Sequence, residues 1–260
     1  MTYTLRLTLL ASAATLAIGT AAQATTIVAL TGDNTLIRMD SETRQAQPAR
    51  RITGADGTVV GIDQRPQDGR LYGITTTGQI VTLDPATGRA TQVSRLNTAF
   101  QPAGRVVFDF NPVANRVRVM GADGQNLRVN VETGEAVTDG RLKNVPGPQE
   151  SSMPRIVAGA YTNSMTGATA TMLLTADTAT NMLNVQNPPN DGVQAPRAAF
   201  SMRLPVGAAM DILSDGTTNT GIVFAGGALH MLDLTSAALT TRGPVRLPRG
   251  AEVIDIAAMR

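Results

Sequence analysis

The chain has 260 residues, and its 22 Lys and Arg residues against 20 Asp and Glu residues leave a formal net charge of only +2. It contains no cysteine, which excludes disulfides, zinc–thiolate sites, iron–sulfur clusters and thiol nucleophiles. Its arginines are scattered rather than clustered in runs, which argues against nucleic acid as a partner.

The first 24 residues have the pattern of an export signal. Arg6 precedes an apolar run from Leu7 to Ile18, and Ala22-Gln23-Ala24 has the small residues that signal peptidase accepts. We predict cleavage after Ala24, which places the remaining chain in the periplasm or outside the cell. The apolar run is shorter than the roughly 20 residues of a membrane-spanning helix. We therefore expect no membrane span after cleavage, and one domain over residues 25–260.

An internal repeat organises the middle of the chain. The segments Asp63–Gly88 and Asp109–Gly134 align without a gap, and Gly78-Gln79 coincides with Gly124-Gln125. Their turns end in threonine-glycine pairs, where glycine accepts positive φ angles without steric cost. A repeat of this length, built from short strands and glycine turns, is typical of one blade of a β-propeller.

The segments between the turns alternate apolar and polar residues. The pattern is clear in Gln79–Leu83, Arg116–Val119 and Leu127–Val131, which are rich in valine, isoleucine and leucine. A period of two with β-branched residues predicts half-buried antiparallel strands. No segment after the leader has a helical period, so the predicted fold class is all-β.

Five apolar strands open successive units of the chain. They are Val59–Asp63, Val106–Phe110, Ile156–Ala160, Ala208–Ile212 and Val253–Ile256. The fifth unit has no residues left to complete it, whereas the strands from Thr26 to Met39 have no opening strand. Pairing of these two incomplete ends would close a ring without a free sheet edge. We therefore predict a monomeric propeller of five blades, each with four strands, in which the terminal strands pair to close the ring. The alternative is six blades, because Ser151–Leu204 is long for one blade.

Several segments resemble one bacterial family. They are Val60–Pro66, Gly69–Gly73, Phe108–Pro112, Asn115–Val119 and Gln125–Arg128. Through these pieces the chain resembles the domain of unknown function family 4394, most strongly between about Val59 and Gly140. The resemblance implies an exported, propeller-like protein. It implies no reaction and no catalytic residue.

Four aspartates occupy the same place in the opening strands. They are Asp63, Asp109, Asp211 and Asp255, and Ala160 takes that place in the remaining unit. Because opening strands are innermost in a propeller, these carboxylates are expected at one level around the axis. We favour their use as acceptors that bind each blade to the next. A calcium site built from the four carboxylates is a second interpretation. An acid–base pair acting on a glycosidic bond is a third.

Few other residues indicate a reaction. His230 lies in an alternating strand, where packing explains it better than catalysis. A set of polar residues lies in the repeat and consists of Arg65, Asn111, Arg118, Asn126, Arg128 and Asn130. These side chains are either solvated residues of exposed strands or a binding site for an anionic ligand or a partner protein. The residues favour a non-catalytic binding or scaffold propeller of the bacterial envelope, with an unknown protein or anionic ligand as partner. The alternative is a hydrolase of glycans or lactones that uses the axial aspartates.

Overall fold

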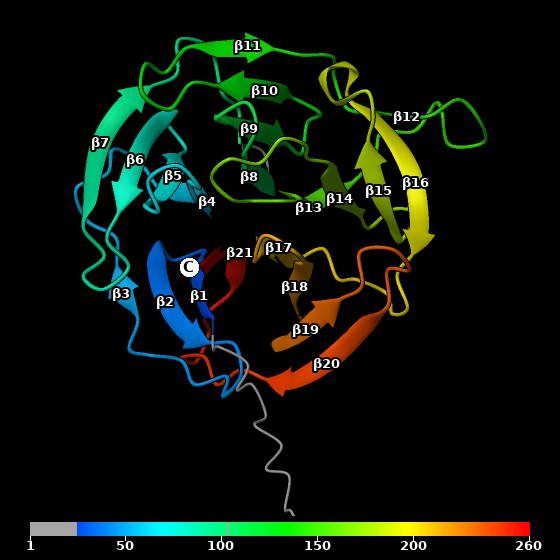
Figure 1. The fold of residues 1–260 in the computed structure, drawn as a ribbon. Helices are drawn as coiled ribbons and strands as arrows, with labels where there is room; N and C mark the ends of the chain where they lie inside the picture. The colour runs from blue at the N-terminus through cyan, green and yellow to red at the C-terminus, as the bar shows by residue number, and fades with distance from the viewer. Residues whose placement is uncertain (1–24, 103) are drawn as a thin grey trace, which may run out of the picture.

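The computed structural model of the chain describes residues 25–102 and 104–260. Five sheets stand side by side around a central axis (Figure 1). A 3₁₀ turn at Pro189–Asp191 is the only helical element among the described residues. The predicted all-β, five-bladed propeller is confirmed. The predicted export signal, residues 1–24, lies outside the described residues.

Four of the five blades have four strands each. Blade 1 contains β21 (Val253–Met259), β1 (Thr26–Thr31), β2 (Thr35–Asp40) and β3 (Arg50–Arg51). Blade 2 contains β4 (Val59–Gln64), β5 (Leu71–Thr75), β6 (Gln79–Leu83) and β7 (Ala90–Arg95). Blade 3 contains β8 (Val106–Asn111), β9 (Arg116–Gly121), β10 (Asn126–Val129) and β11 (Ala136–Thr138). Blade 5 contains β17 (Ala209–Ser214), β18 (Asn219–Ala225), β19 (Ala228–Leu232) and β20 (Leu239–Pro244).

Blade 4 accounts for the segment that suggested a sixth blade. Its strands are β13 (Ile156–Tyr161), β14 (Leu173–Asp177), β15 (Met182–Gln186) and β16 (Val193–Ala199). A fifth strand, β12 (Lys143–Asn144), pairs in parallel with β16 at the outer edge. The extra residues form long connections and the 3₁₀ turn, so the six-bladed alternative is not realised.

The ring is closed by strands from opposite ends of the described chain. β21 pairs antiparallel with β1, with Ile27 opposite Ala258 and Ala29 opposite Ile256. Both strands bury nearly all of their apolar side chains, because they lie between two neighbouring blades. The complementary incompleteness of the two ends in the sequence is therefore resolved by one shared sheet.

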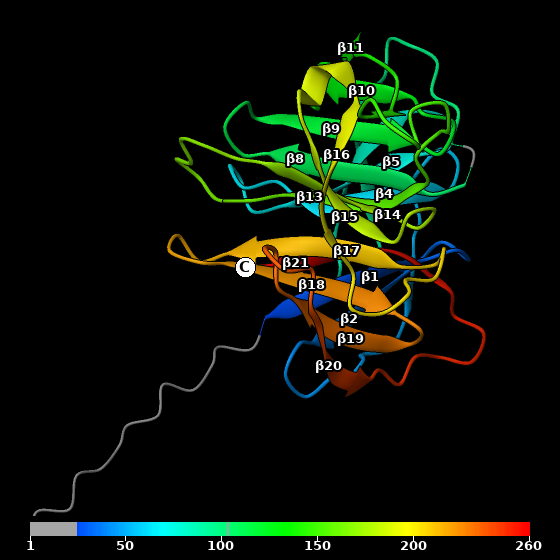
Figure 2. The ribbon, with the colours of Figure 1, turned by 90° about the vertical axis from the view of Figure 1, so that its right-hand side faces the viewer.

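The innermost strands follow one another around the axis in the order β21, β4, β8, β13 and β17. All five run in the same direction, so they begin on one face of the ring and end on the other. We call these the start face and the end face. The side view in Figure 2 shows the C-terminus and the β17–β18 loop together on the end face, at the left.

The apolar core is divided into one cluster for each interface between blades. The interface of blades 4 and 5 has the largest, with fifteen buried residues that include Leu174, Leu183 and Phe200. The interface of blades 3 and 4 has six, among them Val107 and Tyr161. This arrangement follows from the strand pattern, because each sheet presents one face to each of its two neighbours.

Candidate functional site

The predicted aspartates join the inner strands of successive blades. Asp255 accepts the backbone N–H of Ile62 at 2.8 Å, and Asp63 accepts that of Phe110 at 2.7 Å. Each carboxylate thus satisfies a buried backbone donor that the neighbouring strand cannot pair by itself.

The other two aspartates do the same. Asp109 accepts the N–H of Tyr161 at 2.8 Å, and Asp211 accepts that of Ala258 at 2.6 Å. Ala160 interrupts the series, so such a bond is absent from blade 4 to blade 5 among the described residues. The blade-locking contacts that we favoured from the sequence are present in this geometry.

Three of the carboxylates converge at the axis. Asp63, Asp109 and Asp211 each place an oxygen within 4.8 Å of the others, and Asp255 is not part of this set. Burial raises the pKa of Asp63 well above its usual range, helped by the negative charge of Asp211. Burial and the charges of Asp63 and Asp211 do the same to the pKa of Asp109. Burial raises the pKa of Asp211 to about 6. The cluster therefore retains protons in a pH range where exposed carboxyls have lost them.

The central axis has different surroundings at its two ends. On the start face the guanidinium of Arg105 crosses the axis and donates hydrogen bonds to the carbonyl oxygens of Val206, Val253 and Ile254 at 3.1, 3.2 and 2.5 Å. On the end face a cavity of about 290 Å³ reaches down to Asp63 and Asp211. Asp63 and Asp211 are therefore reached from the end face.

A loop of blade 4 lies over this cavity. Ser164, Met165 and Thr166 line it, and the Thr166 hydroxyl donates a 2.6 Å hydrogen bond to the carbonyl oxygen of Pro66 in blade 2. The loop thus reaches from β13 to a blade that is not its neighbour in the ring. The cavity beneath has the volume of a small polar molecule rather than of an extended glycan.

The arrangement of donors limits what the aspartates can do chemically. Asp63 and Asp211 each use both carboxylate oxygens to accept backbone N–H bonds, because Gln64 and Ile212 add a second donor. A cation would have to bind carboxylate oxygens that already accept hydrogen bonds from backbone N–H groups. The partial positive charge of these N–H groups would then face the cation. A protonated carboxyl, in contrast, relieves the repulsion between the three groups directly.

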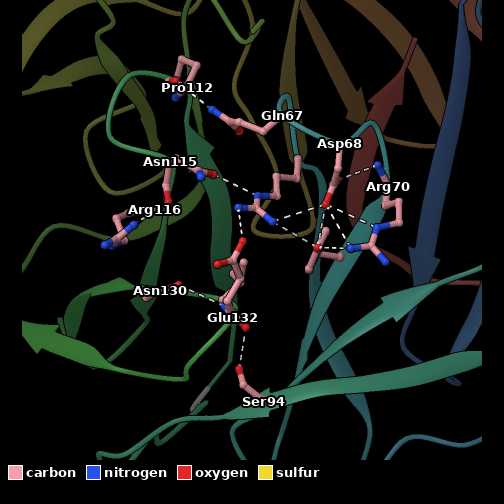
Figure 3. Close-up of polar contacts among 12 residues, drawn as sticks. Gln67, Asp68, Arg70, Ser94, Pro112, Asn115, Arg116, Asn130 and Glu132 are labelled. Carbon is pink, nitrogen blue, oxygen red and sulfur yellow. Dashed lines mark hydrogen bonds and ion pairs between the residues drawn. The ribbon is translucent and has the colours of Figure 1, made fainter.

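Arg65 has a different role from the two that we considered for the polar set. Its side chain is buried between blades 2 and 3, where it donates to Asn115 at 2.9 Å and to Glu132 at 2.8 Å. Asp68, Asn115 and Glu132, which are labelled in Figure 3, all accept hydrogen bonds from this guanidinium. The guanidinium also lies 5.8 Å from the centre of the Tyr72 ring.

Arg118 occupies the next interface in a similar way. It is 2% exposed and pairs with Asp139 at 2.6 Å, with further bonds to Tyr161, Asn126 and Asn190. Of the polar set named from the sequence, Arg65, Arg118 and Asn126 are therefore interior residues that join blades. The interpretation as solvated residues was wrong for these three because their side chains are buried and bind partners in the neighbouring blade.

The remaining members of the set lie nearer the surface. Arg128 pairs with Asp139 at 2.7 Å while remaining partly exposed. Asn111 and Asn130 accept backbone N–H bonds inside their own turns. His230 is buried, and its ring nitrogens contact the Thr241 hydroxyl and the Ala225 carbonyl. The packing role expected for His230 agrees with these contacts.

Taken together, the five sheets, the shared closing blade and the axial aspartates define a five-bladed β-propeller. The family described as a domain of unknown function, DUF4394, matches residues 35–257. The chain belongs to this family, as its resemblance in the repeat region indicated. No curated protein matches the chain in sequence.

Two solved structures of proteins of unknown function match the chain. A protein of unknown function from Bacteroides thetaiotaomicron matches with a TM-score of 0.54 and 16% identity, over 88% of this chain and 63% of that one. A protein of unknown function from Bacteroides caccae matches with a TM-score of 0.45 and 11% identity, over 84% and 72%. The chain thus spans less than two thirds of the first of these proteins. At this identity the likeness concerns the fold alone.

Proposed function

We propose that this chain is an exported, non-catalytic binding propeller of the bacterial envelope. The observation that carries the proposal is the use of the axial carboxylates. All four accept backbone N–H groups from a neighbouring blade, so they are part of the scaffold. Its binding surface is the end face, where one cavity opens at the axis and another between blades 5 and 1.

The envelope location rests on the leader. Arg6, the apolar run to Ile18 and Ala22-Gln23-Ala24 together have the features of a cleaved signal. The described residues contain no helix with the length and hydropathy needed to span a membrane. Fractionation of the host followed by mass spectrometry should find the protein in the periplasm or medium with Thr25 at its amino terminus. Recovery of most molecules with residues 1–24 intact contradicts export by cleavage.

A hydrolase is the second candidate, and one observation favours it. Asp63 and Asp211 line the same end-face cavity, and a carboxyl with a pKa of about 6 suits a general acid or base. The binding propeller and the hydrolase can be distinguished by measuring turnover in the parent protein and in the Asp211→Asn variant. We expect no turnover of glycan or lactone substrates by the purified protein. Turnover that Asp211→Asn abolishes while the protein stays folded establishes the hydrolase instead.

A further inference from the structure

In the interface of blades 2 and 3, long polar side chains of blade 2 fill the space on the end-face side. Arg65 is the second residue after Asp63, its N–H binds the carbonyl oxygen of Arg70, and Asp63 lies opposite Tyr72 in the register. These three side chains, Arg65, Arg70 and Tyr72, occupy the end-face side of the interface with blade 3.

The same three positions in blade 5 carry shorter, less polar side chains. Leu213 is the second residue after Asp211 and lies opposite Thr220, while Asp211 lies opposite Ile222. Leu213, Thr220 and Ile222 are therefore the counterparts of Arg65, Arg70 and Tyr72. They face blade 1, because blade 1 follows blade 5 in the ring.

The carboxylate of this site recurs as well. In blade 3, Glu132 follows Asn130, whose side chain accepts the Glu132 N–H, and Gly134 then takes a positive φ of 76°. In blade 1, Glu42 follows Asp40 in the same turn, with the Glu42 N–H bound to the Asp40 carboxylate. Arg44 takes the left-handed position there with a φ of 58°. Glu42 is thus the counterpart of Glu132.

The space that Arg65 and Tyr72 occupy in one interface is hollow in the other. A cavity of about 740 Å³ opens between blades 5 and 1, lined by the three counterparts, the acidic Glu42 and Asp215, the basic Arg242 and Arg260, and Met231 and Met259. That volume lies within the usual range for small-molecule sites. Glu42 is paired at the rim with Arg242 at 2.8 Å, and both side chains are about two-fifths exposed. A pair this exposed is weak, so a bound cation can replace Arg242.

We propose that this cavity binds a small planar cation on an aromatic body, of the arylamidine or arylguanidine type. The cationic group would take the place of the Arg65 guanidinium beside Glu42, and the ring would take the place of Tyr72 against Ile222. Methionines in the wall suit such a ring because their side chains adapt to irregular shapes. This inference deepens the proposed binding function and rests on it.

Benzamidine is the probe, with benzamide and benzoate as its neutral and anionic counterparts. Titration calorimetry on protein purified from its host should show saturable benzamidine binding that is at least tenfold tighter than that of either counterpart. The double variant Leu213→Arg/Ile222→Tyr refills the cavity as in blade 2 and should lose binding. Thermal unfolding checks that this variant is folded.

Substitutions of the two charged residues at the rim are expected to change benzamidine binding in opposite directions. Glu42→Gln should weaken benzamidine binding at least tenfold, whereas Arg242→Gln should tighten it by removing the competitor. Arg95→Gln is the matched control, because Arg95 pairs with Asp56 at 2.5 Å in another exposed ion pair and should leave binding unchanged. Because Glu42 and Arg242 are exposed, these variants stay informative even if the double variant does not fold.

The inference is overturned if benzamidine does not saturate a site, if benzoate binds more tightly, or if Glu42→Gln has no effect. These failures differ from failure of the proposed function. Turnover dependent on Asp211 removes the non-catalytic proposal whatever benzamidine does. Absence of both turnover and benzamidine binding removes only the assignment of this cavity.

Discussion

The two interfaces of blade 4 are held together by different forces. Towards blade 5 there is no aspartate lock, because Ala160 stands at that position, and the interface has the largest apolar cluster of the described residues. Towards blade 3 the apolar cluster is small, but Asp109 binds Tyr161 and Arg118 is buried among polar partners. The interface without an aspartate lock thus has more apolar burial, and the interface with less apolar burial has more buried polar contacts.

This difference shows how a repeat protein can vary its interfaces while the ring remains closed. Apolar burial contributes roughly in proportion to area and tolerates changes of detail. A buried polar network contributes only when every member has its partner. We therefore expect substitutions to affect the two interfaces unequally, and the following predictions test this.

The largest effect is expected from Arg118→Met. Removing the guanidinium leaves the carboxylate of Asp139, which is 5% exposed, without its shortest ion pair. Loss of one partner of a buried pair costs about 3 to 5 kcal/mol of unfolding free energy. Urea denaturation measures this loss. Arg128→Met, which removes the partly exposed partner of the same carboxylate, should cost about 1 kcal/mol or less. Equal losses would show that burial does not govern this network.

Leu183→Ala tests the apolar interface. Leu183 is fully buried in the cluster between blades 4 and 5, and its truncation should cost about 2 to 5 kcal/mol. Leu183→Met, which conserves volume, should cost less than about 1.5 kcal/mol. If both variants lost the same stability, the contribution of this interface would not come from filled apolar volume.

Asp109→Ala tests the lock itself. It leaves the Tyr161 N–H without an acceptor and should cost about 1 to 3 kcal/mol. Asp109→Asn keeps an acceptor oxygen and removes a charge from the axial cluster, so it should be milder. A loss as large in Asp109→Asn as in Asp109→Ala would mean that the carboxylate charge is required.

The axial cluster also predicts how stability depends on pH. Burial raises the pKa of Asp211 to about 6 and the pKa values of Asp63, Asp109 and Asp255 well above their usual range. The folded state therefore binds more protons than the unfolded state above about pH 4, so stability falls as pH rises through these values. Melting temperatures measured from pH 5 to pH 8 should decrease.

The pH effect has its own control. Asp109→Asn removes one of the repelling groups and should flatten the decrease. Below about pH 4 the trend reverses, because hydrogen bonds from Thr217 and Thr218 lower the pKa of Asp215, and those from Thr43 lower that of Asp40. Stability that rises steadily between pH 5 and pH 8 would contradict retained protons at the axis.

The smallest effect is expected from chelation. If the aspartates hold Ca²⁺, EDTA should lower the melting temperature and Ca²⁺ should restore it. Because backbone N–H groups already occupy these oxygens, we expect EDTA to leave the melting temperature unchanged. A loss that only Ca²⁺ reverses, and that the double variant Asp63→Asn/Asp211→Asn abolishes, would assign the axial cluster to a cation.

The aspartates of the candidate site could be anticipated from spacing, but the arginine at its start-face end could not. The repeat places Asp63, Asp109, Asp211 and Asp255 at equivalent positions, and the structure puts each on an inner strand. Arg105, in contrast, carries no repeat signal, yet its side chain reaches backbone carbonyls more than 100 residues away. The spacing of residues in the repeat predicts which positions are equivalent in different blades. It does not predict which blades contact one another across the axis.

The amino-acid sequence by itself predicted the strands, five blades with six as the alternative, and closure of the ring by the terminal strands. The strands follow from alternation and glycine turns, which are local properties of the chain, and the closure follows from a comparison of its two ends, each of which supplies what the other lacks. Only the tertiary structure decided that Arg65 and Arg118 are buried and that the interface of blades 5 and 1 is hollow. The reason is that Arg65 meets Glu132 after a separation of 67 residues, and Glu42 meets Arg242 after 200. The burial of a charged side chain depends on such distant partners, so no local pattern records it.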